Sequence, residues 1–233
     1  MLQFILVCFS LSTEEKIWSA VLIDSRFDSA VVASIANARH HIPSHVIIHV
    51  ITHSKNWPRA KKALYGMQNC HIVNFSYESS SIDDYNKLLT SKFLWNMFLD
   101  DYILVFQRDS RFCSYSHRRI ENFVGKFDFI GAPWNIVYMG VQVGNGGFSL
   151  RSRSAMLNCI ENNILPANVN EDIAMSACIR NLGLSLPSLE IASEFAVETI
   201  RYSNITPLAV HKSWKYITDD DQLARYCPES VLI

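Results

Sequence analysis

Short apolar runs alternate with helical patterns in the first half of the chain, and this alternation constrains the fold more than any other feature. The runs are rich in valine and isoleucine, as buried strands are. Gly66 follows the second helical pattern and is a good helix terminator. Strands joined by helices pack as a parallel sheet, so we expect a Rossmann-like α/β architecture. The expected strands are residues 18–24, 45–52 and 70–75, and the expected helices are residues 28–39 and 57–64.

A longer helical region and a fourth apolar run come next. Residues 82–98 have a helical pattern, with Asp83 and Asp84 in the first turn, where the helix dipole favours acidic side chains. Residues 103–106 form the fourth run, which we expect to leave the sheet at the segment FQRDS, residues 106–110. No repeat or low-complexity linker interrupts the chain, so we expect a single domain over residues 1–233. Further expected elements are a helix at 118–124, a strand at 127–130 and helices beginning near 152 and 171.

Composition and charge exclude several classes of protein. The hydrophobic fraction of 49% and the charged fraction of 18% are those of a globular protein. A net charge of -1 provides no overall attraction to nucleic acid or to an anionic membrane. The apolar N-terminal stretch is shorter than the roughly 20 residues that span a bilayer. We therefore expect no nucleic-acid partner and no stable membrane span.

The cysteines are scattered and form no CxxC pair, which argues against a zinc knuckle or a disulfide-rich scaffold. We expect buried free thiols in a reducing compartment, and hence a cytoplasmic location. The alternative is the secretory pathway, if the N-terminal stretch is a signal peptide; the sequons at Asn74 and Asn204 would then matter. The six cysteines are Cys8, Cys70, Cys113, Cys159, Cys178 and Cys227.

Asp109 is the first candidate for chemistry. Open α/β sheets bind ligands beyond the carboxyl ends of their strands, and FQRDS lies at such an end. A carboxylate there can hold Mg2+ or Mn2+, which prefer oxygen ligands, together with a diphosphate. Gln107 would point to the same side if the strand geometry persists. The alternative is that Asp109 caps the following turn or pairs with Arg108 or Arg111.

A glycine-rich segment, Gly144-Asn145-Gly146-Gly147, is the second candidate. Adjacent glycines let a ligand approach the backbone closely, which suits a sugar or a phosphate. The segment is neither a dinucleotide-binding GxGxxG nor a Walker loop. The alternative is a tight hairpin or bulge.

Two further candidates lie later in the chain. Glu171 and Asp172 begin a helix, so one of them is a candidate general base, and the alternative is that they only cap the helix. His211 is a candidate metal ligand and Lys212 a candidate phosphate contact. The alternative for His211 is a structural role, as for many lone histidines.

Five segments occur in a characteristic order: ILVFQRDS, FDFIGAPW, VGNGGFSLRSRSAM, NEDIAMSACIRNLG and VHKSW. In this order they resemble a poorly characterised family of glycosyltransferases with the GT-A fold. That family has a strand ending in FQ-x-DS, then YDYIGAPW, GNGGLSLRSR, an ED helix and a late His-Lys-x-Trp. The resemblance extends to VLIDSR and DDYNKLLTSKFLW and spans residues 18–215. It implies a GT-A domain with a central mixed, mostly parallel sheet flanked by helices.

The resemblance also implies roles for individual residues, since GT-A enzymes such as the β-1,4-galactosyltransferases hold a metal with an acidic D-x-D-type motif and a late histidine. The chain departs from D-x-D because Gln107 occupies the first acidic position. By this resemblance, Asp109 and His211 are expected to bind the metal, Asn145, Gly146 and Gly147 to line the donor sugar, Glu171 or Asp172 to act as base, and Asp24 and Arg26 to contact the base or ribose.

The function implied is transfer of a sugar from a nucleotide sugar, with UDP as the expected nucleotide, to the hydroxyl of a glycan, protein or small molecule. We expect dependence on Mn2+ or Mg2+ and inversion at the transferred carbon. A catalytically weak nucleotide-sugar or glycan binding module with a GT-A shell is the alternative, supported by Gln107. A sugar nucleotidyltransferase is a third reading, but the chain lacks a glycine-rich, basic loop after its first strand.

Overall fold

The computed structural model describes residues 17–75, 81–162, 165–166, 168–203, 205–217 and 221–232. The apolar N-terminal stretch, Cys8 and the sequon residue Asn204 lie outside these ranges. Within the ranges, no helix combines the length and the apolarity that crossing a membrane requires.

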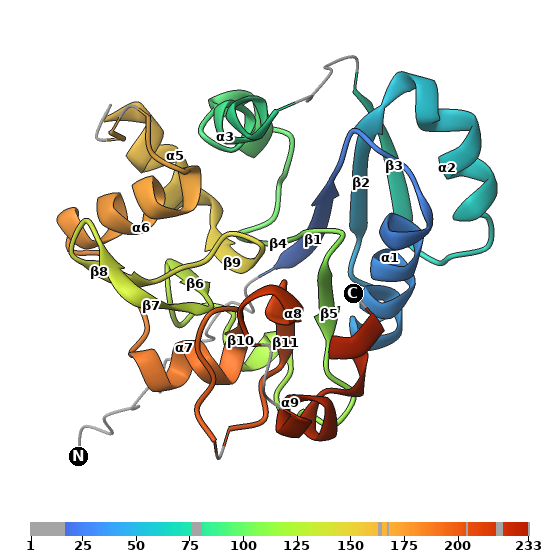
Figure 1. The fold of residues 1–233 in the computed structure, drawn as a ribbon. Helices are drawn as coiled ribbons and strands as arrows, with labels where there is room; N and C mark the ends of the chain where they lie inside the picture. Colours follow the sequence, from blue (N-terminus) through green and yellow to red (C-terminus); the bar gives the residue numbers. More distant parts are fainter. Residues whose placement is uncertain are drawn as a thin grey trace, which may run out of the picture.

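A six-stranded mixed sheet forms the centre of the fold, with strand order β3-β2-β1-β4-β9-β6 (Figure 1). Strands β1 to β4 are mutually parallel, and β9 pairs antiparallel with both β4 and β6. The predicted mixed, mostly parallel α/β sheet is thus confirmed. The strands are β1 (Trp18–Ile23), β2 (Ile48–His53), β3 (Cys70–Phe75), β4 (Tyr102–Phe106), β6 (Phe129–Gly131) and β9 (Phe148–Ser152).

Helices cover both faces of this sheet because successive side chains of a strand point to opposite faces. Leu22 and Leu104 belong to one buried cluster, which also holds residues of α1 and α2. Val21 and Val105 belong to the other, with residues of α3 to α6 (Figure 1). The helices are α1 (Ser29–His41), α2 (Trp57–Ala63), α3 (Ile82–Leu89), α4 (Lys92–Trp95), α5 (Arg153–Glu161), α6 (Glu171–Asn181), α7 (Leu189–Phe195), α8 (Ser213–Tyr216) and α9 (Asp221–Tyr226).

Two small sheets extend the structure beside the carboxyl end of β4. In the order β10-β11-β5, strand β11 pairs antiparallel with β5 and sets His211 opposite Ser110. Since Asp109 precedes β5, this pairing brings the late histidine to the FQRDS segment. The strands are β5 (Ser110–Phe112), β10 (Ala196–Val197) and β11 (Ala209–His211), with β7 (Pro133–Tyr138) and β8 (Val141–Val143) forming the second small sheet.

Two predicted helices differ from the structure. The region 82–98 is two helices, because Thr90 ends α3 and the Ser91 hydroxyl caps the start of α4 by accepting from Leu94 N at 3.4 Å. Residues 118–124 contain only one short 3-10 turn, Ile120–Asn122. Gly125, with a φ of 77°, then takes the chain out of the helical region.

The prediction of free thiols is wrong for most of the described cysteines. Cys113 bonds to Cys227 with a Cα–Cα distance of 4.6 Å, and Cys159 bonds to Cys178 with a Cα–Cα distance of 6.0 Å. Cys70 is the free one among those described. The first bond joins residues 114 apart, which sequence spacing alone does not show. Disulfides are rare in the cytosol, so the argument for a reducing, cytoplasmic location no longer holds.

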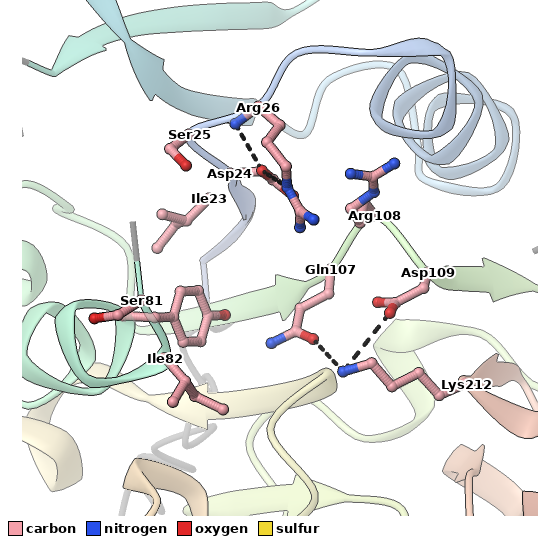
Figure 2. A pocket seen from close by; sticks show the side chains of 11 residues that line it. Ile23, Asp24, Ser25, Arg26, Ser81, Ile82, Gln107, Arg108, Asp109 and Lys212 are labelled. Atoms are coloured by element: carbon pink, nitrogen blue, oxygen red, sulfur yellow. Dashed lines mark hydrogen bonds and ion pairs between the residues drawn. The ribbon is translucent and has the colours of Figure 1, made fainter. Parts of the chain in front are cut away.

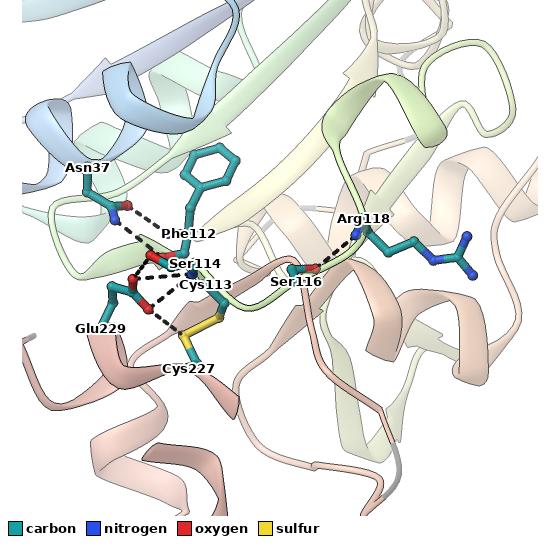
Figure 3. The surroundings of a disulfide bond; sticks show 8 residues. All are labelled: Asn37, Phe112, Cys113, Ser114, Ser116, Arg118, Cys227 and Glu229. Atoms are coloured by element: carbon teal, nitrogen blue, oxygen red, sulfur yellow. Dashed lines mark hydrogen bonds between the residues drawn. A yellow bond between two sulfur atoms is a disulfide. The ribbon is translucent and has the colours of Figure 1, made fainter. Parts of the chain in front are cut away.

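The Cys113–Cys227 bond fastens the C-terminal segment to the end of β5 (Figure 3). The Ser114 amide donates to the Glu229 carboxylate at 3.2 Å, which adds a second tie between the same segments. Asn37 of α1 accepts from Phe112 N at 2.7 Å and holds the other side of β5. The strand that follows Asp109 is therefore restrained from two directions.

Candidate active site

Two pockets meet at the carboxyl ends of β1 and β4. The first, of about 620 Å³, is lined by residues that follow β1 and β4, by the start of α3 and by Lys212. The second, of about 400 Å³, is lined by the glycine segment, the start of α6 and residues around β11 and α8. Ile82, Tyr85, Gln107 and Lys212 line both pockets, so the two spaces adjoin there.

All of the predicted site residues line at least one of these pockets. This placement agrees with the rule that open α/β sheets bind ligands beyond the carboxyl ends of their strands. The first pocket is lined by Asp24, Arg26, Gln107, Asp109 and Lys212, and the second by Gln107, Asn145, Gly146, Gly147, Glu171, Asp172, His211 and Lys212.

The loop after β4 turns alternate side chains in opposite directions. Figure 2 shows Gln107 and Asp109 directed toward Lys212, with Arg108 directed the other way. The Lys212 ammonium lies 3.6 Å from Asp109 Oδ2 and 3.5 Å from Gln107 Oε1. Arg108 pairs with Asp28 at the start of α1 at 2.6 Å. Arg108 is therefore paired with Asp28 and not with Asp109.

His211 is buried between acceptors on both sides of its ring. Its Nδ1 lies 2.9 Å from Asn145 Oδ1 and 3.2 Å from Glu198 Oε1. Its Nε2 lies 3.1 Å from Gln107 Oε1 and 3.4 Å from Asp109 Oδ1. Burial lowers the pKa of His211, but the contacts with Asp109 and Glu198 outweigh it and raise the pKa above its usual value.

Asp109 is held as a carboxylate. Burial alone would raise its pKa, but His211 and Lys212 lower the pKa to about 2. Its Oδ1 atom is buried and makes no aligned hydrogen bond within the described ranges; the 3.4 Å approach of His211 Nε2 is an ion-pair contact. This oxygen thus has unused capacity to accept a ligand.

The glycine segment makes room for the protein's own side chains. A Cβ atom on Gly147 would lie 2.0 Å from the His211 ring, and one on Gly146 would lie 2.6 Å from Glu171 Oε1. Among the three glycines, Gly144 has a positive φ, of 113°. Asn145 donates to Glu198 Oε2 at 2.7 Å and accepts from Gly147 N at 3.0 Å, so it orients the loop around His211.

The two acids that begin α6 have different environments. Glu171 is 3% exposed and accepts from both terminal nitrogens of Arg151 at 2.6 and 3.0 Å. Arg151 is fully buried and also lies over the Phe129 ring. The Glu171 carboxylate is therefore engaged in a buried ion pair.

Among the described residues, no cation forms an ion pair of this kind with Asp172. Its Oδ2 accepts from Gly146 N at 2.9 Å, and the side chain lines the second pocket. Burial, and then the negative charge of Glu171, raise the pKa of Asp172 to about 6. A carboxylate with such a pKa is suited to accept a proton near neutral pH.

Sequence reasoning missed three residues of this region. Glu198 follows β10 and orients His211, but nothing in the surrounding FAVET segment marks it as part of a site. Trp134 of the GAPW segment lines the second pocket. Tyr85 lines both pockets, and its place within a helical pattern does not mark it as part of a site.

Asp109 and His211 carry the kinds of oxygen and nitrogen donor that divalent cations use. The buried, unused Oδ1 of Asp109, the Nε2 of His211 and the Oε1 of Gln107 converge at the meeting of the pockets. The donor set is small, because the described residues contain no group of three histidine, cysteine or acidic side chains arranged to hold a metal. Glu198 lies on the other side of the imidazole and orients it, as carboxylates commonly do for metal-binding histidines.

Solved glycosyltransferases have the same fold. The mannosyltransferase PcManGT from Pyrobaculum calidifontis, in complex with GDP-Man and Mn2+, is 10% identical with a TM-score of 0.52, and the match covers 76% of this chain and 56% of that one. GlyE of Streptococcus pneumoniae TIGR4 is 14% identical with a TM-score of 0.52, and the match covers 88% of this chain and 55% of that one. These similarities confirm the glycosyltransferase-like α/β class, and this chain spans little more than half the length of either protein.

Residues 69–211 match a family whose description is a protein of unknown function, DUF5672. The chain belongs to this family. The match extends from β3 to β11 and so includes the FQRDS loop, the glycine segment and the start of α6. No curated protein matches the chain in sequence.

Proposed function

We propose that the protein is a glycosyltransferase that moves a sugar from a nucleoside diphosphate sugar to an acceptor hydroxyl. The supporting observation is that two pockets adjoin at Gln107 and Lys212, with Asp109 in the first and Asp172 in the second. A single displacement needs such an arrangement because the acceptor oxygen and the diphosphate leaving group lie on opposite sides of the anomeric carbon of the donor. The resemblance favours a UDP-sugar as donor and leaves a glycan, a protein or a small molecule as acceptor.

The first pocket suits the nucleoside diphosphate. Arg108 and Lys212 contribute two cationic side chains to its wall, and a guanidinium group can bind two phosphate oxygens at once. Asp24 accepts from the Arg26 guanidinium at 3.0 Å, so the two residues contact the ribose or base as a unit. The second pocket, beside Asp172, then receives the acceptor.

Asp109 and His211 are the proposed metal ligands, with Gln107 as an additional oxygen donor. A bound Mn2+ or Mg2+ would neutralise charge on the diphosphate leaving group. Lys212 contributes positive charge to the same place, because its ammonium lies 3.6 Å from the Asp109 carboxylate. This ammonium would neutralise diphosphate charge directly, beside a metal site in which Gln107 takes the place of a second carboxylate.

Asp172 is the proposed base, rather than Glu171, whose carboxylate is engaged by Arg151. As the acceptor oxygen bonds to the anomeric carbon, its proton passes to Asp172. The bond between that carbon and the diphosphate oxygen breaks, and the electron pair leaves with the nucleoside diphosphate. A single displacement of this kind inverts the anomeric carbon.

A binding module with little turnover is the second candidate. The observation favouring it is that His211 is already surrounded by four acceptor atoms while Gln107 replaces an acid. Calorimetry with UDP and GDP, with and without Mn2+, tests the proposed site in the wild type and in Asp109→Asn. Our proposal predicts Mn2+-dependent binding that Asp109→Asn loses. Equal binding by both proteins would refute the site, whereas tight binding without turnover of any nucleotide sugar would favour the module.

A further inference from the structure

The Tyr85 hydroxyl is a buried polar group without an aligned hydrogen bond. Its oxygen is shielded from solvent and has no partner of normal hydrogen-bond geometry within the described part of the chain, although the Gln107 side chain interacts with it and lowers its pKa. Buried tyrosine hydroxyls are nearly always hydrogen-bonded, because leaving one unpaired costs the folded protein its lost hydration. An unpaired hydroxyl therefore suggests that its partner is a molecule other than the protein.

The location of this hydroxyl points to the same conclusion. Tyr85 lines both pockets, and Asp109 Oδ1, another buried oxygen without a hydrogen bond in the described ranges, belongs to the first pocket. The other buried side-chain atoms without partners in these ranges are serine oxygens outside both pockets, namely Ser19 Oγ, Ser176 Oγ and Ser213 Oγ. The Tyr85 hydroxyl, a donor, and Asp109 Oδ1, an acceptor, thus both belong to residues that line the first pocket.

The chain holds Tyr85 in place and keeps its hydroxyl protonated. Ser81 caps α3 by accepting from Asp84 N at 3.2 Å, and the Tyr85 ring packs against the buried cluster beneath that helix. Burial, followed by the negative charge of Glu171, raises the pKa of Tyr85 far above its usual value. The group therefore acts as a hydrogen-bond donor in a fixed position.

We propose that the Tyr85 hydroxyl donates a hydrogen bond to the sugar of the bound nucleotide sugar. This inference rests on the proposed function. The sugar is the part of the donor that reaches the junction of the pockets, because the cations of the first pocket take the diphosphate and Asp24 and Arg26 take the nucleoside. Sugar hydroxyls supply the acceptor that Tyr85 lacks, and the contact helps to select which sugar is transferred.

The substitution Tyr85→Phe should have opposite effects on stability and on binding. Removing an unpaired buried hydroxyl should leave the melting temperature unchanged or raise it by about 2–4 °C. Affinity for the preferred nucleotide sugar should fall about tenfold, the effect of losing one good hydrogen bond. Affinity for the free nucleotide should change little, because the proposed contacts of the nucleotide are with Asp24, Arg26, Arg108 and Lys212 and not with the Tyr85 hydroxyl.

The experiment measures melting temperature and calorimetric affinity with Mn2+ for UDP, UDP-glucose, UDP-galactose, UDP-N-acetylglucosamine, GDP and GDP-mannose. Tyr102→Phe is the matched control, because Tyr102 begins β4 at the end opposite Gln107 and its hydroxyl interacts with Ser152. This control should keep wild-type affinity for every ligand.

Selective loss of nucleotide-sugar affinity without loss of stability would support the role of Tyr85. Equal affinities of the wild type and Tyr85→Phe for every nucleotide sugar would overturn it and leave the glycosyltransferase proposal intact. A fall in melting temperature would show that the hydroxyl has a partner within the protein, which also overturns the inference. If the wild type binds none of the ligands, both proposals fail.

Discussion

The Nε2 atom of His211 lies 3.4 Å from Oδ1 of Asp109, and the antiparallel pairing of β11 with β5 holds the two residues together. The backbone adds a direct link, since Lys212 N donates to Asp109 O at 3.1 Å. A segment near the end of the chain is thereby fixed against the loop that leaves the central sheet. In the proposed metal site, this contact would place an imidazole nitrogen beside the carboxylate of a Q-x-D sequence.

Gly147 should be essential for the position of His211. In Gly147→Ala the new methyl carbon would lie 2.0 Å from the ring, so His211 must move and lose its contacts with Asn145 and Asp109. We expect a stability loss of about 1–3 kcal/mol from overpacking and at least a hundredfold loss of sugar transfer. Thermal unfolding and a transfer assay measure the two effects.

Gly183→Ala is the matched control for this substitution. Gly183 has a φ of 67°, and no described atom lies within 4 Å of a Cβ built there. It should therefore lose about 1–2 kcal/mol through backbone strain alone and keep its transfer activity. Full activity of Gly147→Ala would contradict the packing that we assign to His211.

Asp172→Asn should lose activity and gain stability. The pKa of Asp172 is raised to about 6 by burial and then by the charge of Glu171. Its folded-state pKa exceeds the unfolded value of about 3.9, so its contribution to stability is fully present below pH ~4 and is lost as the pH rises through ~6. At pH 7 the ionised side chain costs at most about 3 kcal/mol, which asparagine removes while keeping an oxygen for Gly146 N.

The measurements are urea unfolding at pH 4 and pH 7 and the pH dependence of transfer. The stability advantage of Asp172→Asn should grow between these pH values. Transfer by the wild type should rise with pH through about 6, as the base ionises, and Asp172→Asn should be roughly 10²–10⁴-fold slower. A variant with wild-type rates would remove Asp172 from the mechanism.

Arg151 should matter for stability more than any exposed arginine. Arg151→Met leaves Glu171 buried without its cation and should cost about 3–5 kcal/mol. The double variant Arg151→Met with Glu171→Leu should recover much of this loss, because no charge then remains buried without a partner. Denaturant unfolding of the single and double variants measures this recovery.

Arg118→Met provides the comparison. Arg118 pairs with Glu194 at 2.6 Å, but its side chain is 48% exposed, so its loss should cost no more than about 1 kcal/mol. Equal losses for Arg118→Met and Arg151→Met would contradict the buried ion pair.

Much of the fold could be predicted from local patterns. The strand bounds 70–75 agree with β3, and the predicted run 18–24 overlaps β1, because a buried strand requires a continuous apolar segment and that segment is visible in the sequence. The break between α3 and α4 could not be predicted, because Ser91 caps the second helix only after the chain turns at Thr90.

The site was predictable where single residues follow strand ends, as Asp109 follows β4. Contacts between distant segments could not be predicted from the sequence, and they change the interpretation of several residues. The sequence predicted a ligand beside Gly147 and did not show that this glycine, which lines the second pocket, also leaves room for the His211 ring. It also did not show that Glu198 orients this histidine or that Cys113 meets Cys227.

The central claim is that the site around Asp109 cleaves a nucleotide sugar. Its most direct test measures release of nucleoside diphosphate from UDP-glucose, UDP-galactose, UDP-N-acetylglucosamine and GDP-mannose with Mn2+. Asp83→Asn serves as the control, since Asp83 is exposed and lines neither of the two adjoining pockets. Release by the wild type and Asp83→Asn from at least one donor, with at least a hundredfold loss in Asp109→Asn, is the predicted result. No release by the wild type from any donor, or equal release by Asp109→Asn, would contradict the claim.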